Sequence, residues 1–172
     1  MNKQVIISNG SGTSGKDTFV EMLNLIKPNI AYKYSSIDLV KKCAEILGWN
    51  GGKTEKDRKF LSDLKLLATD YNNAPFNDIK AIVKDFKDNK IETELLFIDI
   101  REPDEIDKAV KEFNAISLLV RRKNAPKINS NMADANVENY DYNYIINNDG
   151  TLEDLKGQAI IFLKELEETQ NG

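Results

Sequence analysis

Residues 4 to 20 read QVIISNGSGTSGKDTFV, in which an apolar strand runs directly into a glycine-rich loop and then into a helix. Gly10 to Lys16 fit the pattern Gly-x-x-x-x-Gly-Lys. Backbone N–H groups at the start of a helix can bind phosphate, and glycine allows the tight turn that aims them at one point. The pattern predicts a phosphate-binding loop made of Gly10, Ser11, Gly12, Thr13, Ser14, Gly15, Lys16, Asp17 and Thr18. The alternative is a glycine-rich turn that binds no ligand.

Three side chains at the end of this loop suggest a nucleotide with a metal ion. Lys16 is placed to reach the β- and γ-phosphates, and the helix from Lys16 to about Leu25 adds the positive end of its dipole. Position 17 departs from the pattern, because a Ser or Thr that ligates Mg²⁺ usually stands there. Mg²⁺ prefers oxygen ligands, so the Asp17 carboxylate can take that place directly or through water. We expect Thr18 beside it, at the α-phosphate.

The composition excludes several classes of protein. With 172 residues, 41% of them hydrophobic, the chain can form one domain (1–172) with a full core. A net charge of −4 argues against a general nucleic-acid-binding protein, and no stretch is apolar enough to span a membrane. The absence of histidine excludes His-dependent triads and His metal sites. The single cysteine, Cys43, excludes an intramolecular disulfide and fits a cytoplasmic protein. We expect the protein to be a monomer or a homodimer.

Apolar runs of strand length alternate along the chain with segments of helical period. This alternation is typical of a parallel sheet covered by helices on both faces. Five strands are expected, at about 3–8, 30–34, 93–100, 115–120 and 142–146. A crossover helix is predicted from Pro103, and a last helix from Thr151, with Leu152 among its buried residues. The predicted fold class is α/β with three layers.

Two segments of the chain interrupt this alternation. Residues 35–92 carry helical patterns between the second and third strands, including a predicted apolar face formed by Phe60, Leu64, Leu67 and Tyr71. We expect this stretch to be a helical insertion that binds a substrate. Residues 121–141 are rich in Asn and have no apolar period, and a loop of this length usually acts as a lid or is disordered. We expect a lid-like loop there.

A second functional element follows the third predicted strand, in LLFIDIREPDE. Ligands of open α/β sheets bind beyond the carboxyl ends of the strands, so Asp99 and Arg101 can both reach the phosphate loop. Asp99 is a candidate Mg²⁺ ligand through water, and Arg101 a candidate clamp for a phosphate. Glu105 can orient Arg101, or it can be a solvated acid in the first turn of a helix. The alternative for the whole element is an ordinary strand end with a surface ion pair.

The chain has four arginines against twenty lysines. Arg101, Arg121 and Arg122 follow two strands at the same sheet edge, and Arg58 lies in the insertion. Arginine suits sites where a phosphate is bound by two parallel hydrogen bonds, so these positions indicate phosphate recognition, with chance placement as the alternative. Phosphoryl transfer to an acceptor phosphate needs no general base, which agrees with the absence of histidine.

These motifs resemble those of the P-loop nucleoside monophosphate kinases, and within them the deoxynucleoside monophosphate kinases of phages and bacteria. GKDT at 15–18 is similar to the phosphate loop of that family, so Asp17 fits a family pattern. The segment SSIDLVKK supplies an Asp-x-x-Lys helix start, KTEKDRKFL a Lys-Asp-Arg, FIDIREPDEID an Asp-x-Arg-x-x-x-Glu, and NNDGT a final turn. The likeness extends over nearly the whole chain, although Glu102-Pro103-Asp104 and the insertion differ from the family pattern.

The resemblance implies a P-loop NTPase fold with a helical insertion for the nucleoside monophosphate and a lid. It implies an ATP- and Mg²⁺-dependent kinase whose acceptor is a small phosphorylated molecule, first of all a (deoxy)nucleoside monophosphate. The resemblance implies catalytic roles for Lys16, Asp99, Arg101, Arg121 and Arg122, and metal binding by Asp17, Thr18 and Asp99. It places the acceptor at Asp38, Lys41, Arg58, Arg101 and Glu105, and the adenine near Asn148 and Gly150.

Three other functions stay open from the sequence. The acceptor can be a different metabolite, such as dephospho-coenzyme A, phosphomevalonate or a sugar-like alcohol, and an alcohol would need Asp38 or Asp99 as a base. The protein can instead be a regulatory or assembly protein that binds ATP with little turnover. A degenerate P-loop domain that serves only as a structural partner is the third.

Overall fold

The computed structural model describes residues 2–123 and 137–171, and at its centre lies a parallel sheet of five strands. In the order β2-β3-β1-β4-β5, every neighbouring pair is parallel. The strands are β1 (Gln4–Asn9), β2 (Ala31–Ser35), β3 (Leu95–Asp99), β4 (Ile116–Arg121) and β5 (Tyr144–Asn147). The predicted five-stranded sheet is confirmed, with each end within three residues of its expected place. Because β1 lies between β3 and β4, the phosphate loop after β1 is flanked by the ends of both.

Six helices are described, and some of their ends have a clear local cause. They are α1 (Lys16–Ile26), α2 (Asp38–Ile46), α3 (Glu55–Asn72), α4 (Ala74–Lys87), α5 (Pro103–Phe113) and α7 (Leu152–Asn171). Thr54 and Asp57 form a reciprocal capping box at the start of α3. Asn73, with φ of 56°, turns the chain from α3 into α4, and the predicted helix at Pro103 is present. In the two described ranges no helix has the length and apolar character that a membrane crossing requires.

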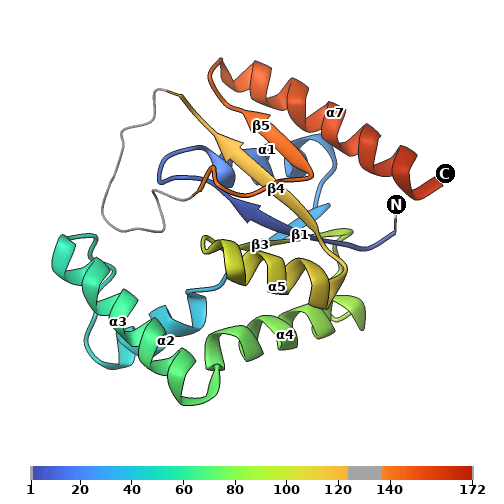
Figure 1. Cartoon of the computed structure of the whole chain (residues 1–172). Coiled ribbons are helices and arrows are strands. Elements are labelled where there is room, and N and C mark those ends of the chain that lie inside the picture. The colour runs from blue at the N-terminus through green and yellow to red at the C-terminus, as the bar shows by residue number, and fades with distance from the viewer. Residues whose placement is uncertain (1, 124–136, 172) are drawn as a thin grey trace.

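Two helices cover each face of the sheet, which gives the predicted three layers (Figure 1). On one face α1 and α7 pack through Phe19 and Phe162, whose rings meet edge to face at 5.6 Å above Phe97 of β3. On the other face α4 and α5 pack through Phe76 and Phe113, whose stacked rings are 5.7 Å apart. Burial of these aromatic side chains from both sides fixes the strand ends that carry the site.

The helices α2 and α3 form a separate pair at the lower left of Figure 1. Their small core contains Val40, Ala44 and Leu61, with Ile37, Trp49, Phe60 and Leu64 packed against it. The predicted stretch 35–92 therefore divides, because α2 and α3 stand beside the sheet while α4 packs on it.

Three apolar residues expected at buried faces are exposed instead. Leu67 is 67% and Tyr71 85% exposed, because α3 packs on α2 near its start and its last turns extend beyond that small core. Leu152, in the first turn of α7, is 64% exposed and lies at the rim of a cavity. Of the predicted lid, residues 124–136 lie outside the described part of the chain.

Candidate active site

The loop between β1 and α1 is closed on itself by its own lysine. The Lys16 ammonium donates to the Gly10 carbonyl oxygen at 2.7 Å. Gly10 lies so close to β4 that a Cβ there would be 2.3 Å from the Val120 carbonyl oxygen, so this position has no room for a side chain. Gly15 stands before the first turn of α1 with φ of 97°, in the left-handed region that favours glycine. The strand, the turn and the helix start therefore have the geometry that the sequence pattern predicts for a phosphate loop.

A buried hydroxyl in this loop is unsatisfied. Ser14 is 1% exposed, and its Oγ has no hydrogen-bond partner among the described residues. A buried polar atom without a partner costs about 1–3 kcal/mol, so native proteins seldom keep one unless a ligand or water completes it. Ser14 lines the cavity beside the loop, where a phosphate oxygen can serve as the missing partner.

The loop and the turn after β5 enclose a first cavity of about 340 Å³. Its walls are Ser11, Thr13, Ser14, Gly15, Lys16, Asp17, Thr18, Arg122, Asn148, Gly150, Thr151 and Leu152. The Asn148 side-chain amide donates to the Ser14 carbonyl oxygen at 3.0 Å, which ties the turn to the loop. The structure thus brings Asn148 and Gly150, the residues expected near the adenine, against the predicted phosphate loop.

The two arginines after β4 take different positions. Arg121 is the last residue of β4, and its Nε donates to the Asn147 side-chain oxygen at 2.7 Å. Arg122 is exposed and lines the first cavity. Arg122 can therefore contact a nucleotide from this position, whereas Arg121 connects the ends of β4 and β5.

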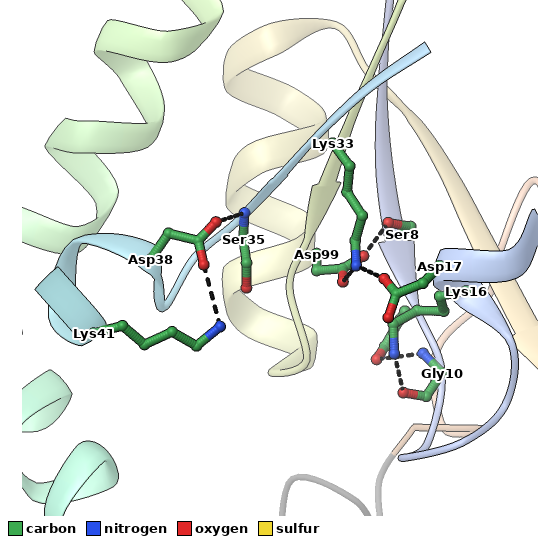
Figure 2. A network of polar contacts seen from close by, with 10 residues as sticks. Ser8, Gly10, Lys16, Asp17, Lys33, Ser35, Asp38, Lys41 and Asp99 are labelled. Atoms are coloured by element: carbon green, nitrogen blue, oxygen red, sulfur yellow. Dashed lines mark hydrogen bonds and ion pairs between the residues drawn. The ribbon is translucent and has the colours of Figure 1, made fainter. Parts of the chain in front are cut away.

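The two carboxylates predicted for Mg²⁺ meet at an ammonium group from a third element (Figure 2). Asp99 accepts a hydrogen bond from the Ser8 hydroxyl at 2.5 Å on one oxygen, and its other oxygen is 2.9 Å from the Lys33 Nζ. The same Lys33 ammonium forms an ion pair with Asp17. Asp99 is only 15% exposed, whereas Asp17 is 75% exposed at the mouth of the site.

This arrangement fits a divalent cation that also takes ligands from a nucleotide. The Lys33 ammonium marks a point where Asp17 and Asp99 converge on one positive charge. Among the described residues no group of three or more His, Cys, Asp or Glu side chains can hold a metal ion. Asp17 and Asp99 can therefore supply part of an Mg²⁺ shell, which phosphate oxygens and waters would have to complete. Thr18, the third predicted ligand, lines the first cavity together with Asp17, whereas Asp99 lines the second.

A second cavity, of about 670 Å³, lies on the other side of the loop and reaches α2 and α3. Its basic lining residues are Lys16, Lys33, Lys41, Lys53, Arg58, Lys65 and Arg101, and its acidic ones are Asp17, Asp38, Asp99 and Glu102. Thr13, Lys16 and Asp17 line both cavities. An excess of positive charge in the pocket of a protein with a net charge of −4 indicates an anionic ligand.

Four of the five residues predicted for the acceptor line this second cavity, and the fifth, Glu105, is not among its described lining residues. Asp38 accepts from the Ser35 backbone N–H at 2.9 Å and from Lys41 at 3.3 Å, as Figure 2 shows. Arg58 of α3 and Arg101 after β3 both line this cavity. Glu105 pairs with Lys65 at 2.8 Å, and Lys65 rather than Glu105 is among the described residues that line the cavity.

Sequence reasoning missed three residues of the site. Lys33 stands in the middle of an apolar strand, and a lone charged residue in such a run was the available signal. Asn9, directly before Gly10, accepts from the Gly10 backbone N–H at 2.8 Å and donates to the Tyr142 hydroxyl at 2.7 Å. Both are buried, and Tyr142 donates in turn to the Val137 carbonyl oxygen at 2.8 Å. Asn9 and Tyr142 thus fix the start of the phosphate loop through buried hydrogen bonds.

Comparison with solved structures shows the fold. The chain is similar to a sugar kinase from Janibacter sp. HTCC2649, at 15% identity over 94% of this chain and 95% of the other, with a TM-score of 0.51. It is also similar to the tunicamycin resistance protein of Deinococcus radiodurans, at 10% identity over 94% and 96% of the two chains and a TM-score of 0.52. TT1252 from Thermus thermophilus matches at 18% identity over 96% and 99%, with a TM-score of 0.50.

Neither a protein-family model nor a curated protein sequence matches this chain. The structural matches share less than a fifth of their residues with it, so they establish the architecture alone. That architecture is a three-layer α/β fold around a parallel sheet of five strands, as predicted from the sequence.

Proposed function

We propose that this protein is a kinase that transfers the γ-phosphoryl group of ATP to a small phosphorylated acceptor, a deoxynucleoside monophosphate by first choice. The observation that carries the proposal is the meeting of two cavities at Lys16. One cavity lies between the phosphate loop and the turn after β5, and the other between the loop and α2–α3. A donor in the first and an acceptor in the second would have their phosphates facing each other at this lysine, as in-line transfer requires.

The nucleotide side of the site matches what a triphosphate needs. The backbone N–H groups of the loop and the start of α1 provide hydrogen bonds and the positive end of a helix dipole. The Lys16 ammonium bonds to the Gly10 carbonyl oxygen, at the place where the β- and γ-phosphates would enter the loop, and in this proposal it exchanges that bond for the phosphates. Arg122 adds a positive charge, and Asn148 and Gly150, in the turn after β5, also line this cavity.

In this proposal Asp17, Thr18 and Asp99 hold Mg²⁺. The ion would supply charge stabilisation for the phosphates during transfer. The Ser8 hydroxyl donates to one oxygen of Asp99 at 2.5 Å and fixes this carboxylate, whose other oxygen contacts the Lys33 ammonium that Asp17 also contacts. Because Asp99 is mostly buried and held in one orientation, it is better suited to position the ion than the exposed Asp17 alone.

The acceptor side favours a substrate that already carries a phosphate. Arg58 and Arg101 can bind a phosphate through paired N–H donors, and Lys41 adds a further positive charge. An acceptor phosphate oxygen is anionic and needs no base. An alcohol would need one, but Asp38 is bonded to Ser35 and Lys41, and Asp99 serves the metal ion in this proposal. This engagement supports the phosphorylated acceptor over the alcohol.

The proposal is tested by measuring ADP formation from ATP and Mg²⁺, alone and with each deoxynucleoside and ribonucleoside monophosphate. We expect one or a few monophosphates to raise turnover far above the blank and to appear as diphosphates. Lys16→Ala should abolish transfer, whereas Lys59→Ala, which removes an exposed lysine paired with Asp63, should not. ATP binding without stimulation by any phosphorylated acceptor would contradict the proposal and favour a regulatory nucleotide-binding protein.

A further inference from the structure

Lys33 provides a positive charge at the point where the two proposed metal ligands meet. Its strand β2 is at the edge of the sheet, next to β3, and Lys33 pairs in register with Phe97 two residues before Asp99. From there its ammonium contacts Asp99 at 2.9 Å and forms an ion pair with Asp17 of α1 (Figure 2). The Lys33 side chain is 29% exposed, so most of its surface is buried.

This ion pair relates to the one departure in the phosphate loop. A Ser or Thr after the loop lysine would be neutral, whereas Asp17 adds a second negative charge beside Asp99. Two carboxylates that converge without a cation repel each other and attract divalent ions. The Lys33 ammonium has three donors and a full charge, which cancels one of the two negative charges.

We propose that Lys33 is a built-in counter-ion that keeps divalent cations off the protein until a nucleotide is bound. With Lys33 in place, the cluster of Asp17, Asp99 and Lys33 has a net charge of −1 and offers little attraction to a free metal ion. Phosphate oxygens restore the missing negative charge and the missing ligands, so the metal enters together with the nucleotide. The inference rests on the proposed function only in assigning Asp17 and Asp99 to Mg²⁺.

The test is a titration of the nucleotide-free protein with Mn²⁺, which also prefers carboxylate ligands and is followed by electron spin resonance. Wild type should bind Mn²⁺ weakly. Lys33→Met removes the competing charge and should tighten binding by at least about tenfold, equivalent to about 1.4 kcal/mol. Lys33→Met combined with Asp17→Asn should return to weak binding. Lys59→Met removes one lysine from an exposed pair with Asp63, outside the described walls of both cavities, and should leave Mn²⁺ binding unchanged.

Equal Mn²⁺ affinities of wild type and Lys33→Met would overturn the inference. A gain that persists in the double variant would also overturn it, because the cation would then bind elsewhere. Lys33→Gln keeps hydrogen-bond donors for both carboxylates without the charge, and it gives the same test if the Met variant fails to fold. No nucleotide or acceptor is present in this titration. Its result can therefore be interpreted even if the proposed kinase reaction is not observed.

Discussion

The side-chain amide of Asn148 lies directly against Gly15, across the mouth of the first cavity. Its Nδ2 donates to the Ser14 carbonyl oxygen at 3.0 Å and would be 2.2 Å from a Cβ on Gly15. The turn after β5 is thus packed against the last glycine of the phosphate loop. Gly15 is required for two separate reasons, its φ of 97° and the space that Asn148 occupies.

These two requirements can be separated by three alanine substitutions. Gly48 has φ of 95° and open space around it. Gly48→Ala should therefore lower the free energy of unfolding by about 1–2 kcal/mol through backbone strain alone. Gly157→Ala, inside α7 with nothing within 4 Å, should raise it by about 0.5–1 kcal/mol. Gly15→Ala should lower the free energy of unfolding by more than Gly48→Ala does. It should also lose nucleotide binding. Urea unfolding and calorimetry measure the two effects, and similar losses at Gly15 and Gly48 would remove Asn148 from the explanation.

Asn148→Ala should weaken ATP binding without weakening acceptor binding. The substitution removes one hydrogen bond to the loop, worth about 1 kcal/mol or roughly a fivefold rise in the Kd for ATP. The Kd for the acceptor should stay unchanged, because Asn148 lines the first cavity and is not among the described walls of the second. Asn77→Ala on the exposed face of α4 is the matched control. Equal weakening of both ligands would place Asn148 outside the nucleotide site.

Much of the fold could be predicted because it follows from local patterns. The run Val5–Ile7 predicts a buried strand, and the glycines after it predict the turn into α1. Asp99 and Arg101 could be placed near the loop because strand ends of a parallel sheet meet at one edge. The apolar period failed for Leu67, Tyr71 and Leu152, because spacing alone does not say how far a packed neighbour extends.

The side-chain contacts of the site could not be predicted in the same way. Asn9 and Tyr142 are 133 residues apart in the sequence, and no local pattern relates an Asn before a loop to a Tyr before the last strand. Lys33 likewise reaches Asp17 and Asp99 only because β2 lies beside β3 in the sheet. Such pairings depend on strand order, and several orders were compatible with the sequence pattern.

Tyr142→Phe should destabilise the protein and loosen the phosphate loop. The hydroxyl donates to the Val137 carbonyl oxygen and accepts from Asn9, so its loss leaves buried groups without a partner at a cost of about 1–3 kcal/mol. Tyr71→Phe, at an 85% exposed side chain, should change the free energy of unfolding by less than about 0.5 kcal/mol. Denaturant unfolding compares the two, and an equal effect would mean that the Asn9–Tyr142 bond does not support the loop.

Because Arg58 and Arg122 line different cavities, replacing them should affect the KM for different substrates. Arg58→Met should raise the KM for the acceptor by about tenfold or more, as expected for loss of a charged hydrogen bond worth about 1.5–3 kcal/mol, with little change for ATP. Arg122→Met should instead raise the KM for ATP, and by less, because Arg122 is exposed. Steady-state kinetics with each substrate varied in turn measures both. If Arg58→Met raised the KM for ATP and Arg122→Met raised the KM for the acceptor, the donor and acceptor cavities would have to be exchanged.

Stability should fall in alkaline solution because phenol groups are held in their neutral form. Burial, and then a hydrogen bond to Asp107 at 3.0 Å, raise the pKa of Tyr140 to about 12. The pKa of a tyrosine in the unfolded chain is about 10, so below that pH both states keep the proton and the stabilisation is complete. Between about pH 10 and 12 the unfolded chain releases the proton first, and the free energy of unfolding falls as the pH rises. Urea unfolding of wild type and Tyr140→Phe should show a shallower decline for the variant only in this window, and parallel curves would mean that this phenol does not contribute.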